Sequence, residues 1–292
     1  MKKFTIQNEH LSISVLEKGA ELCSIKNLKT EKEHIWQANP EIWSSHAPNL
    51  FPIIGILKGG QYFYKGKTYE MPKHGMLRHN EDIRVKEKAE NKLVFELIYS
   101  EESLKTYPFK FNFQIIFKLK GKKLKVSHKI TNLDSKIMFF SLGGHPAFNT
   151  PINNDEKYKD YYLEFDQNMD LSTHILNNEG LVSLNTKKIL QNEKKIQLHE
   201  HLFDDDALIF KNIPSKEVAL KSQLSGTILT LEYSDFKNLG VWAKPGAPYV
   251  CIEPWLGIAD LEGTDQNLET KEDILKLEAG KKFEAAYTIK IE

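Results

Sequence analysis

The sequence predicts an all-β protein, a large antiparallel β-sandwich with few short helices. Apolar residues recur with a period of two in both halves of the chain, turn signals separate these runs, and a helical period is scarce. Each such strand has to bury one face against a second layer, which is the arrangement of a sandwich. The 292 residues contain no linker, repeat or low-complexity tract, so we expect a single domain over residues 1–292.

The alternating runs are spread over the whole chain. Two of them, Phe111 to Leu119 and Leu124 to Ile130, flank the turn Gly121-Lys122-Lys123 and predict a hairpin with one buried face. We expect further strands at Leu11 to Val15, Leu93 to Tyr99, Thr227 to Tyr233 and Phe283 to Ile291.

Two segments are candidates for helices. Glu101 to Tyr107 has the length of a short helix, and it ends before Pro108, since proline cannot continue a helix. The second candidate, Thr270 to Leu277, is barely two turns long.

Charge and hydropathy exclude several classes of protein. The chain has 40 basic and 40 acidic residues, so no electrostatic excess favours nucleic acid or an anionic membrane surface as a partner. The N-terminus lacks the apolar run of a signal peptide, and no window reaches the roughly 18 apolar residues of a membrane span. Two cysteines, Cys23 and Cys251, cannot form a disulfide framework, which fits a reducing compartment. We therefore expect a cytoplasmic protein, and the sequence leaves its oligomeric state open.

Four segments interrupt the strand pattern by combining polar residues with aromatic residues, glycine and proline. They are Asn49 to Gly55, Pro72 to His79, Gly143 to Asn149 and Cys251 to Trp255. Such segments are typical of loops and strand ends that line a cleft in a sandwich. We therefore expect the functional site where these four segments meet.

His145 and Glu253 are the first candidates for acid–base chemistry. Two glycines precede His145 and Pro146 follows it, which suits a rigidly held catalytic imidazole, although a lone histidine in such a loop more often caps a turn. Glu253 follows an apolar run and precedes Pro254 and Trp255. Partial desolvation there would raise its pKa toward that of a general base near neutral pH, but a structural glutamate fits the same position.

Other candidate side chains accompany this pair. His74 precedes a glycine, and Arg78, one of only two arginines, follows four residues later. The three aspartates from Asp204 to Asp206 either form a solvated turn or direct one carboxylate into the cleft. Trp255 has the strongest claim among the tryptophans to stack on a ligand, whereas Trp36 and Trp43 are expected to pack in the core or at its rim.

The sequence contains no pattern typical of a metal or cofactor site. His199-Glu200-His201 would place two imidazoles on one face of a strand, but no third ligand follows at a useful spacing. Zinc-binding Cys-x-x-Cys and His-Glu-x-x-His patterns, glycine-rich phosphate loops and a Gly-x-Ser-x-Gly elbow are absent. We therefore expect no metal and no cofactor.

Five motifs occur in a characteristic order along nearly the whole chain. They are Gly19 to Leu22, Phe51 to Gly55, His74-Gly75, Gly144 to Asn149 and Cys251 to Trp255. Together they resemble the aldose 1-epimerase (galactose mutarotase-like) family, and most closely its LacX-like branch. The resemblance implies a β-supersandwich with an open cleft and no cofactor.

The resemblance also implies roles for particular residues. The two histidines and the glutamate that act in the family correspond to His74, His145 and Glu253. An aspartate that binds sugar hydroxyls falls within Asp204 to Asp206, where we favour Asp206. Many galactose mutarotases carry an arginine at the position that here is about Ile56, and Arg78 is our candidate to replace it. Three residues in or beside the motifs complete the expected substrate-binding set: Phe51, Asn149 and Trp255.

The expected activity is the interconversion of the α and β anomers of a hexose or a related sugar, an isomerase reaction. It requires removal of the O1 proton, protonation of the ring oxygen O5, and closure on the other face of the aldehyde, so a base and an acid must face each other across the ring. Glu253 is the expected base and His145 the expected acid. His74 would stabilise the charge that develops near O5.

Three alternatives remain open from the sequence. Arg78 and nearby lysines could bind a phosphate, which would make the substrate a sugar phosphate. The chain could also be a non-catalytic carbohydrate-binding module, since a fold does not dictate function. A glycosidase would need a second carboxylate opposite Glu253, and Asp206 is the candidate for it.

Overall fold

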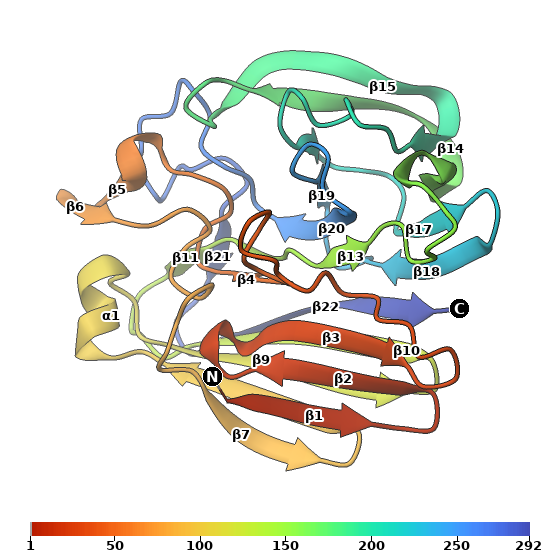
Figure 1. Cartoon of the computed structure of the whole chain (residues 1–292). Coiled ribbons are helices and arrows are strands. Elements are labelled where there is room, and N and C mark those ends of the chain that lie inside the picture. Colours follow the sequence, from red (N-terminus) through yellow and green to blue (C-terminus); the bar gives the residue numbers. More distant parts are fainter. Residues whose placement is uncertain (1) are drawn as a thin grey trace.

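The computed structural model describes residues 2–292 and has an all-β architecture of four sheets (Figure 1). The strands pair in the antiparallel sense throughout these sheets. The predicted fold class is therefore confirmed. Helical structure in residues 2–292 is limited to α1 (Glu101–Thr106) and three short 3-10 helices, η1 (Lys18–Ala20), η2 (Lys58–Gly60) and η3 (Tyr158–Asp160).

A three-stranded sheet packs against one half of the large sheet, in the lower part of Figure 1. The rings of Phe4 and Phe95, one from each sheet, meet edge to face with their centroids 5.9 Å apart. The small sheet consists of β1 (Lys3–Gln7), β2 (Leu11–Leu16) and β3 (Glu21–Asn27). This half of the large sheet consists of β7 (Arg84–Ala89), β8 (Lys92–Ile98), β9 (Phe111–Lys120), β10 (Lys123–Asn132) and β22 (Lys282–Ile291).

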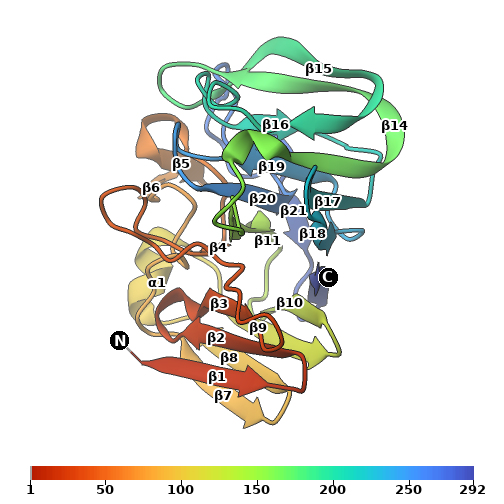
Figure 2. The ribbon, with the colours of Figure 1, turned by 45° about the vertical axis from the view of Figure 1, so that its right-hand side comes forward.

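The large sheet continues from β22 into the upper half of the molecule (Figures 1 and 2). The order there is β18 (Gly226–Glu232), β17 (Glu217–Ser222), β14 (Tyr161–Leu176), β16 (Leu208–Phe210), β19 (Asn238–Trp242), β20 (Tyr249–Leu256), β12 (Leu142–Gly144) and β4 (Asn49–Leu50). β15 (Val182–Gln197) also pairs with β14, and β13 (Ala147–Asn149) with β20. Two small sheets pair β5 (Gln61–Tyr64) with β6 (Lys67–Glu70), and β11 (Met138–Phe140) with β21 (Leu275–Leu277).

The hydrophobic core follows the period of two that the sequence shows. In β9 the side chains at odd positions from Phe111 to Leu119 are buried, whereas the even positions are half-buried or exposed. The predicted hairpin is formed by β9 and β10, with Lys120 opposite Lys123. β2, β8, β18 and β22 lie where alternation predicted strands. Burying one apolar face per strand supplies the main stabilisation of such a sandwich.

The helix predicted from Glu101 to Tyr107 is confirmed as α1. Ser100 caps its first turn, because the Ser100 hydroxyl accepts a hydrogen bond from the backbone N–H of Ser103. The helix predicted from Thr270 to Leu277 is wrong. Its C-terminal part is β21, which pairs with β11, so a long-range strand pairing prevails over a helical pattern too short to be stable alone.

The segment His199–His201 is also not the strand that we considered for it. These residues lie in a turn after β15, so the two imidazoles do not share a strand face. Cys23 and Cys251 are both free and buried. None of the helices in residues 2–292 has the length and apolar character needed to cross a membrane.

Candidate active site

A cavity of about 400 Å³ opens in the upper half of the molecule, a size typical of small-molecule sites. It is formed by β20, the β12–β13 connection, the loop from Lys73 to Arg78 and the segment that precedes β16. Predicted site residues that line it are His74, Arg78, His145, Asp206, Glu253 and Trp255. Its wall also includes Trp43, Ile56, Lys73, Asp204 and Trp242.

Glu253 lies in the middle of β20, a strand whose eight residues are all buried. β19 pairs with β20 along one edge, and on the other edge β13 and β12 pair with the residues before and after Glu253, so the strand is rigidly held. Since side chains alternate along a strand, Cys251, Glu253 and Trp255 share one face. Gly240 of β19 lies opposite Glu253, and a Cβ there would come within 2.6 Å of the Trp255 ring. The glycine therefore gives Trp255 the space to lie against β19.

His145 reaches the cavity from the connection between β12 and β13. Its backbone N–H donates to the carbonyl of Pro48 at 3.0 Å, and its ring stacks on Trp43 with centroids 5.1 Å apart. The imidazole Nε2 lies 3.3 Å from Oε2 of Glu253. The predicted acid and base are therefore in direct contact.

His74 lies in a strained loop that a close backbone approach holds in place. His74 has a φ of 68°, which is uncommon for a residue other than glycine, and Gly75 follows with a φ of 82°. A Cβ on Gly75 would lie 2.2 Å from the carbonyl oxygen of Phe51, so only glycine fits there. The Gly55 N–H donates to Nδ1 of His74 at 3.2 Å. This bond assigns the proton of the neutral His74 ring to Nε2.

Burial shifts the pKa values of all three residues toward their uncharged forms. It raises the pKa of Glu253 well above its usual value, while the positive charges of Lys73 and Arg78 act in the opposite direction. It lowers the pKa of His145 to about 3 and that of His74 well below its usual value. Glu253 and His145 therefore form an uncharged pair in which the carboxyl holds the proton.

Arg78 and the aspartates supply polar groups at the edge of the cavity. Nη2 of Arg78 donates to the hydroxyl of Ser45 at 3.0 Å, and its buried Nε has no partner. Asp204 and Asp206 line the cavity, whereas Asp205 lines a different hollow and pairs with Lys187 at 3.1 Å. Two of the three aspartates, including the favoured Asp206, therefore lie at the cavity.

Phe51 and Asn149 do not lie on the cavity wall. Phe51 is fully buried in the core, with its ring centroid 4.7 Å from that of Phe113. Its carbonyl accepts the N–H of Met76 at 2.9 Å, so it supports the His74 loop. The Asn149 side-chain amide donates to the carbonyl of Ile35 at 3.0 Å. Both residues hold the motifs to which they belong in place, and neither lines the cavity.

Three residues on the cavity wall were missed from the sequence. Trp43 was expected in the core or at its rim, yet it stacks on His145, and Trp242 lies edge-on to Trp43 at 5.7 Å. Lys73 could have been found, because it directly precedes His74. No local signal identifies Trp43, since it reaches His145 only through the folding of a long connection.

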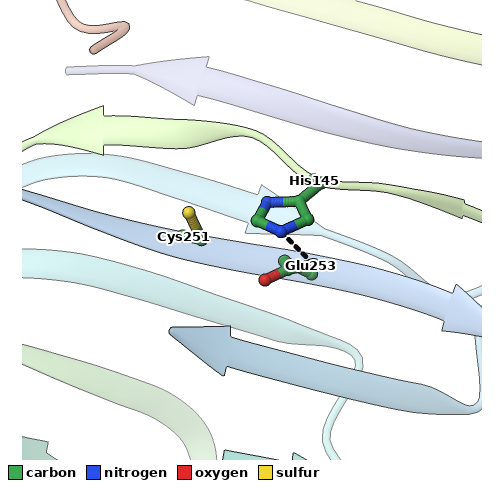
Figure 3. Close-up of side chains that lie close together, drawn as sticks. All are labelled: His145, Cys251 and Glu253. Atoms are coloured by element: carbon green, nitrogen blue, oxygen red, sulfur yellow. Dashed lines mark ion pairs between the residues drawn. The ribbon is translucent and has the colours of Figure 1, made fainter. Parts of the chain in front are cut away.

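Three potential metal ligands also lie together in this site. Ligand atoms of His145, Cys251 and Glu253 lie within 4.8 Å of one another (Figure 3). Neither spacing nor a known motif in the sequence indicated this set, because His145 comes from a distant part of the chain.

Comparisons with known proteins agree with the fold and identify the family. A family profile described as aldose 1-epimerase matches residues 2–269, and the chain therefore belongs to the aldose 1-epimerase family. It is 34% identical over 281 residues to protein LacX of Lactococcus lactis subsp. lactis, in both its plasmid and chromosomal forms, which covers 93% of this chain and 93% of that protein. The resemblance predicted from the five motifs is confirmed.

Two solved structures show the same fold over the whole chain. A galactose mutarotase related enzyme from Lactobacillus acidophilus is 35% identical, with a TM-score of 0.95, and the match covers 100% of this chain and 97% of that one. A galactose mutarotase-like protein from Lactobacillus casei ATCC 334 is 30% identical, with a TM-score of 0.93 and full coverage of both chains, 100% and 100%. The galactose mutarotase-like fold is therefore confirmed.

Proposed function

We propose that the protein is an aldose 1-epimerase that interconverts the α and β anomers of a hexose or a related free sugar. The observation that carries this proposal is the convergence of His74, His145 and Glu253 on one cavity of about 400 Å³. These three residues come from three distant parts of the chain.

Unpartnered polar atoms in the cavity wall support a ligand rich in hydroxyls. Four atoms of lining residues have no hydrogen-bond partner: Arg78 Nε, His145 Nδ1, Glu253 Oε2 and Trp255 Nε1. Buried polar atoms in proteins are normally hydrogen-bonded. A sugar offers both donors and acceptors at close spacing, and the half-buried ring of Trp242 in the cavity wall offers an aromatic surface for its apolar side.

The ring-opening step moves two protons and breaks one bond. The carboxylate of Glu253 takes the O1 proton, the imidazolium of His145 gives its proton to O5, and the C1–O5 bond breaks to leave the aldehyde. Glu253 and His145 are then uncharged, which is the state that burial favours. Closure on the other face of the aldehyde reverses both transfers and yields the other anomer. The enzyme thus stabilises the open-chain form. The positive charges of Lys73 and Arg78 favour the carboxylate of Glu253, whereas they disfavour the imidazolium of His145.

His74 would act as a hydrogen-bond donor near O5. Its Nδ1 is occupied as an acceptor of the Gly55 N–H, so Nε2–H is the free donor of the neutral ring. A donor fixed in a buried site stabilises developing negative charge on the ring oxygen without reorganising.

A saturation-transfer NMR measurement of anomer exchange with glucose and galactose tests the proposal. We expect the protein to accelerate exchange, and Glu253→Gln to remove the acceleration while sugar binding survives. A wild-type protein that binds sugar but never accelerates exchange would instead be a carbohydrate-binding module.

A phosphorylated sugar is the second candidate substrate, favoured by the two cations Lys73 and Arg78 in the cavity wall. Guanidinium and ammonium groups both bind phosphate oxygens. Glucose 6-phosphate and galactose 6-phosphate belong in the same NMR series. Activity on a phosphate with none on the free sugars would assign the enzyme to sugar phosphates.

A further inference from the structure

We propose that His145, Cys251 and Glu253 bind a thiophilic divalent transition metal ion such as Zn²⁺, and that the bound ion blocks the epimerase reaction. The ligand set consists of one imidazole nitrogen, one thiol sulfur and one carboxylate oxygen. The blocking effect rests on the proposed function, whereas the binding site does not.

The three side chains meet because of strand geometry and one long-range contact. Cys251 and Glu253 are two residues apart in β20, so both project from the same face of the strand. His145 approaches this face from the β12–β13 connection (Figure 3). Within residues 2–292, this is the one group of three or more potential ligands that lie within 4.8 Å of one another.

The existing distances suit a tetrahedral ion. Nε2 of His145 and Oε2 of Glu253 are 3.3 Å apart. In a tetrahedral site with zinc bonds of about 2.0–2.2 Å, the ligating nitrogen and oxygen lie roughly 3.3–3.5 Å apart. These two ligands therefore need little movement. The sulfur of Cys251 lies within 4.8 Å of both other ligand atoms. Rotation of its side chain can adjust the sulfur–nitrogen distance to the roughly 3.5 Å that a zinc–sulfur bond of about 2.3 Å requires.

Burial and unmet hydrogen bonding also point to a ligand at this position. All three side chains are buried, and Oε2 of Glu253 has no hydrogen-bond partner. A bound cation would give this oxygen the partner that no protein group supplies. Nitrogen and sulfur ligands select zinc-like ions over Mg²⁺ or Ca²⁺, which prefer oxygen. The fourth coordination position would face the cavity that His145 and Glu253 line.

Metal binding and sugar chemistry would compete for the same atoms. The ion would occupy Nε2 of His145 and an oxygen of Glu253, which are the groups proposed to exchange protons with the sugar. On binding, Cys251 would release its thiol proton and Glu253 its carboxyl proton to solvent, so the apparent affinity for the metal rises with pH.

Binding is tested with Co²⁺ and Zn²⁺ on the full chain after treatment with EDTA and dialysis. We expect one Co²⁺ per chain with a thiolate-to-cobalt charge-transfer band. Cys251→Ala should lose this band and weaken Zn²⁺ binding at least tenfold, the lower bound for disturbing a metal site. Cys23→Ala, which removes the other free buried thiol, is the matched control. It should keep the charge-transfer band and the wild-type affinity for Zn²⁺. A band that persists in Cys251→Ala, or none in the folded wild type, overturns the site.

Inhibition is tested separately by anomer exchange, with each variant compared with its own metal-free rate. Zn²⁺ should inhibit anomer exchange by the wild type and by Cys23→Ala, and EDTA should restore the activity of both. Cys251→Ala should need at least tenfold more Zn²⁺ for the same degree of inhibition. Metal binding without inhibition overturns the blocking effect alone. A protein that binds Co²⁺ but accelerates exchange of no sugar overturns the proposed function and leaves the metal site in place.

Discussion

His145 and Glu253 are in direct contact on the wall of the cavity, with Nε2 of the imidazole 3.3 Å from Oε2 of the carboxyl group. Both side chains are almost fully buried, and Oε2 of Glu253 has no hydrogen-bond partner. Burial favours the uncharged pair, and a proton moved between the two residues converts it to the charged pair. This relationship lets one site both accept and donate a proton.

Replacing Glu253 by glutamine should lower kcat for anomer exchange by roughly 10²–10⁴-fold, because the positioned proton acceptor is lost. His145→Asn should have an effect of the same order. NMR binding experiments on the same samples should still detect the sugar. Glu102→Gln, at an exposed position in α1, is the control and should exchange anomers at the wild-type rate. Wild-type rates in Glu253→Gln would exclude this carboxylate as the base.

Two variants of His74 separate its donor from its acceptor function. His74→Gln retains an amide donor near the place of Nε2, whereas His74→Asn retains an acceptor near Nδ1 for the Gly55 N–H. Asparagine also tolerates the φ of 68° better than glutamine does. We expect His74→Gln to have the higher kcat of the two variants, and His74→Asn to have the higher melting temperature. The opposite order of kcat would argue against a donor role at O5.

A methyl group at Gly240 should displace Trp255. The added Cβ would lie 2.5 Å from the Trp255 ring, so the ring has to move toward the cavity or the strand has to shift. Gly240→Ala should cost about 1–3 kcal/mol of unfolding free energy and should change the tryptophan fluorescence. Gly263→Ala, where a Cβ meets nothing within 4 Å, is the control. Equal stability of the two variants would contradict the close packing of Trp255.

The raised pKa of Glu253 has a consequence for stability. Above the usual glutamate pKa of 4.5, the unfolded chain releases this proton while the folded chain retains it, so wild-type stability falls as pH rises toward the folded pKa. The slope for one group is at most about 1.4 kcal/mol per pH unit. Glu253→Gln lacks this term, so its stability relative to the wild type should increase from about pH 5 to about pH 8. Denaturant unfolding at several pH values measures this relative stability. A stability of Glu253→Gln that falls relative to the wild type as pH rises would show that Glu253 is ionised in the folded protein.

Much of this protein could be predicted from local sequence. The alternation from Phe111 to Leu119 identified the buried face of β9, since a side-chain period of two is a property of any extended strand. The motifs identified His74, His145 and Glu253, which the cavity brings together. The sequence therefore determined the fold class, the family and the three central residues of the candidate site.

Long-range pairing decided the rest. Leu275 to Leu277 form a strand because they pair with β11. The local sequence pattern does not indicate this pairing. Phe51 carries a motif but points into the core, because a motif identifies a residue and not the direction of its side chain. Cys251 and Trp43 come beside His145 only when the segments that hold them are folded together. Such contacts depend on how strands and loops distant in sequence are packed, and this information exists only in the tertiary structure.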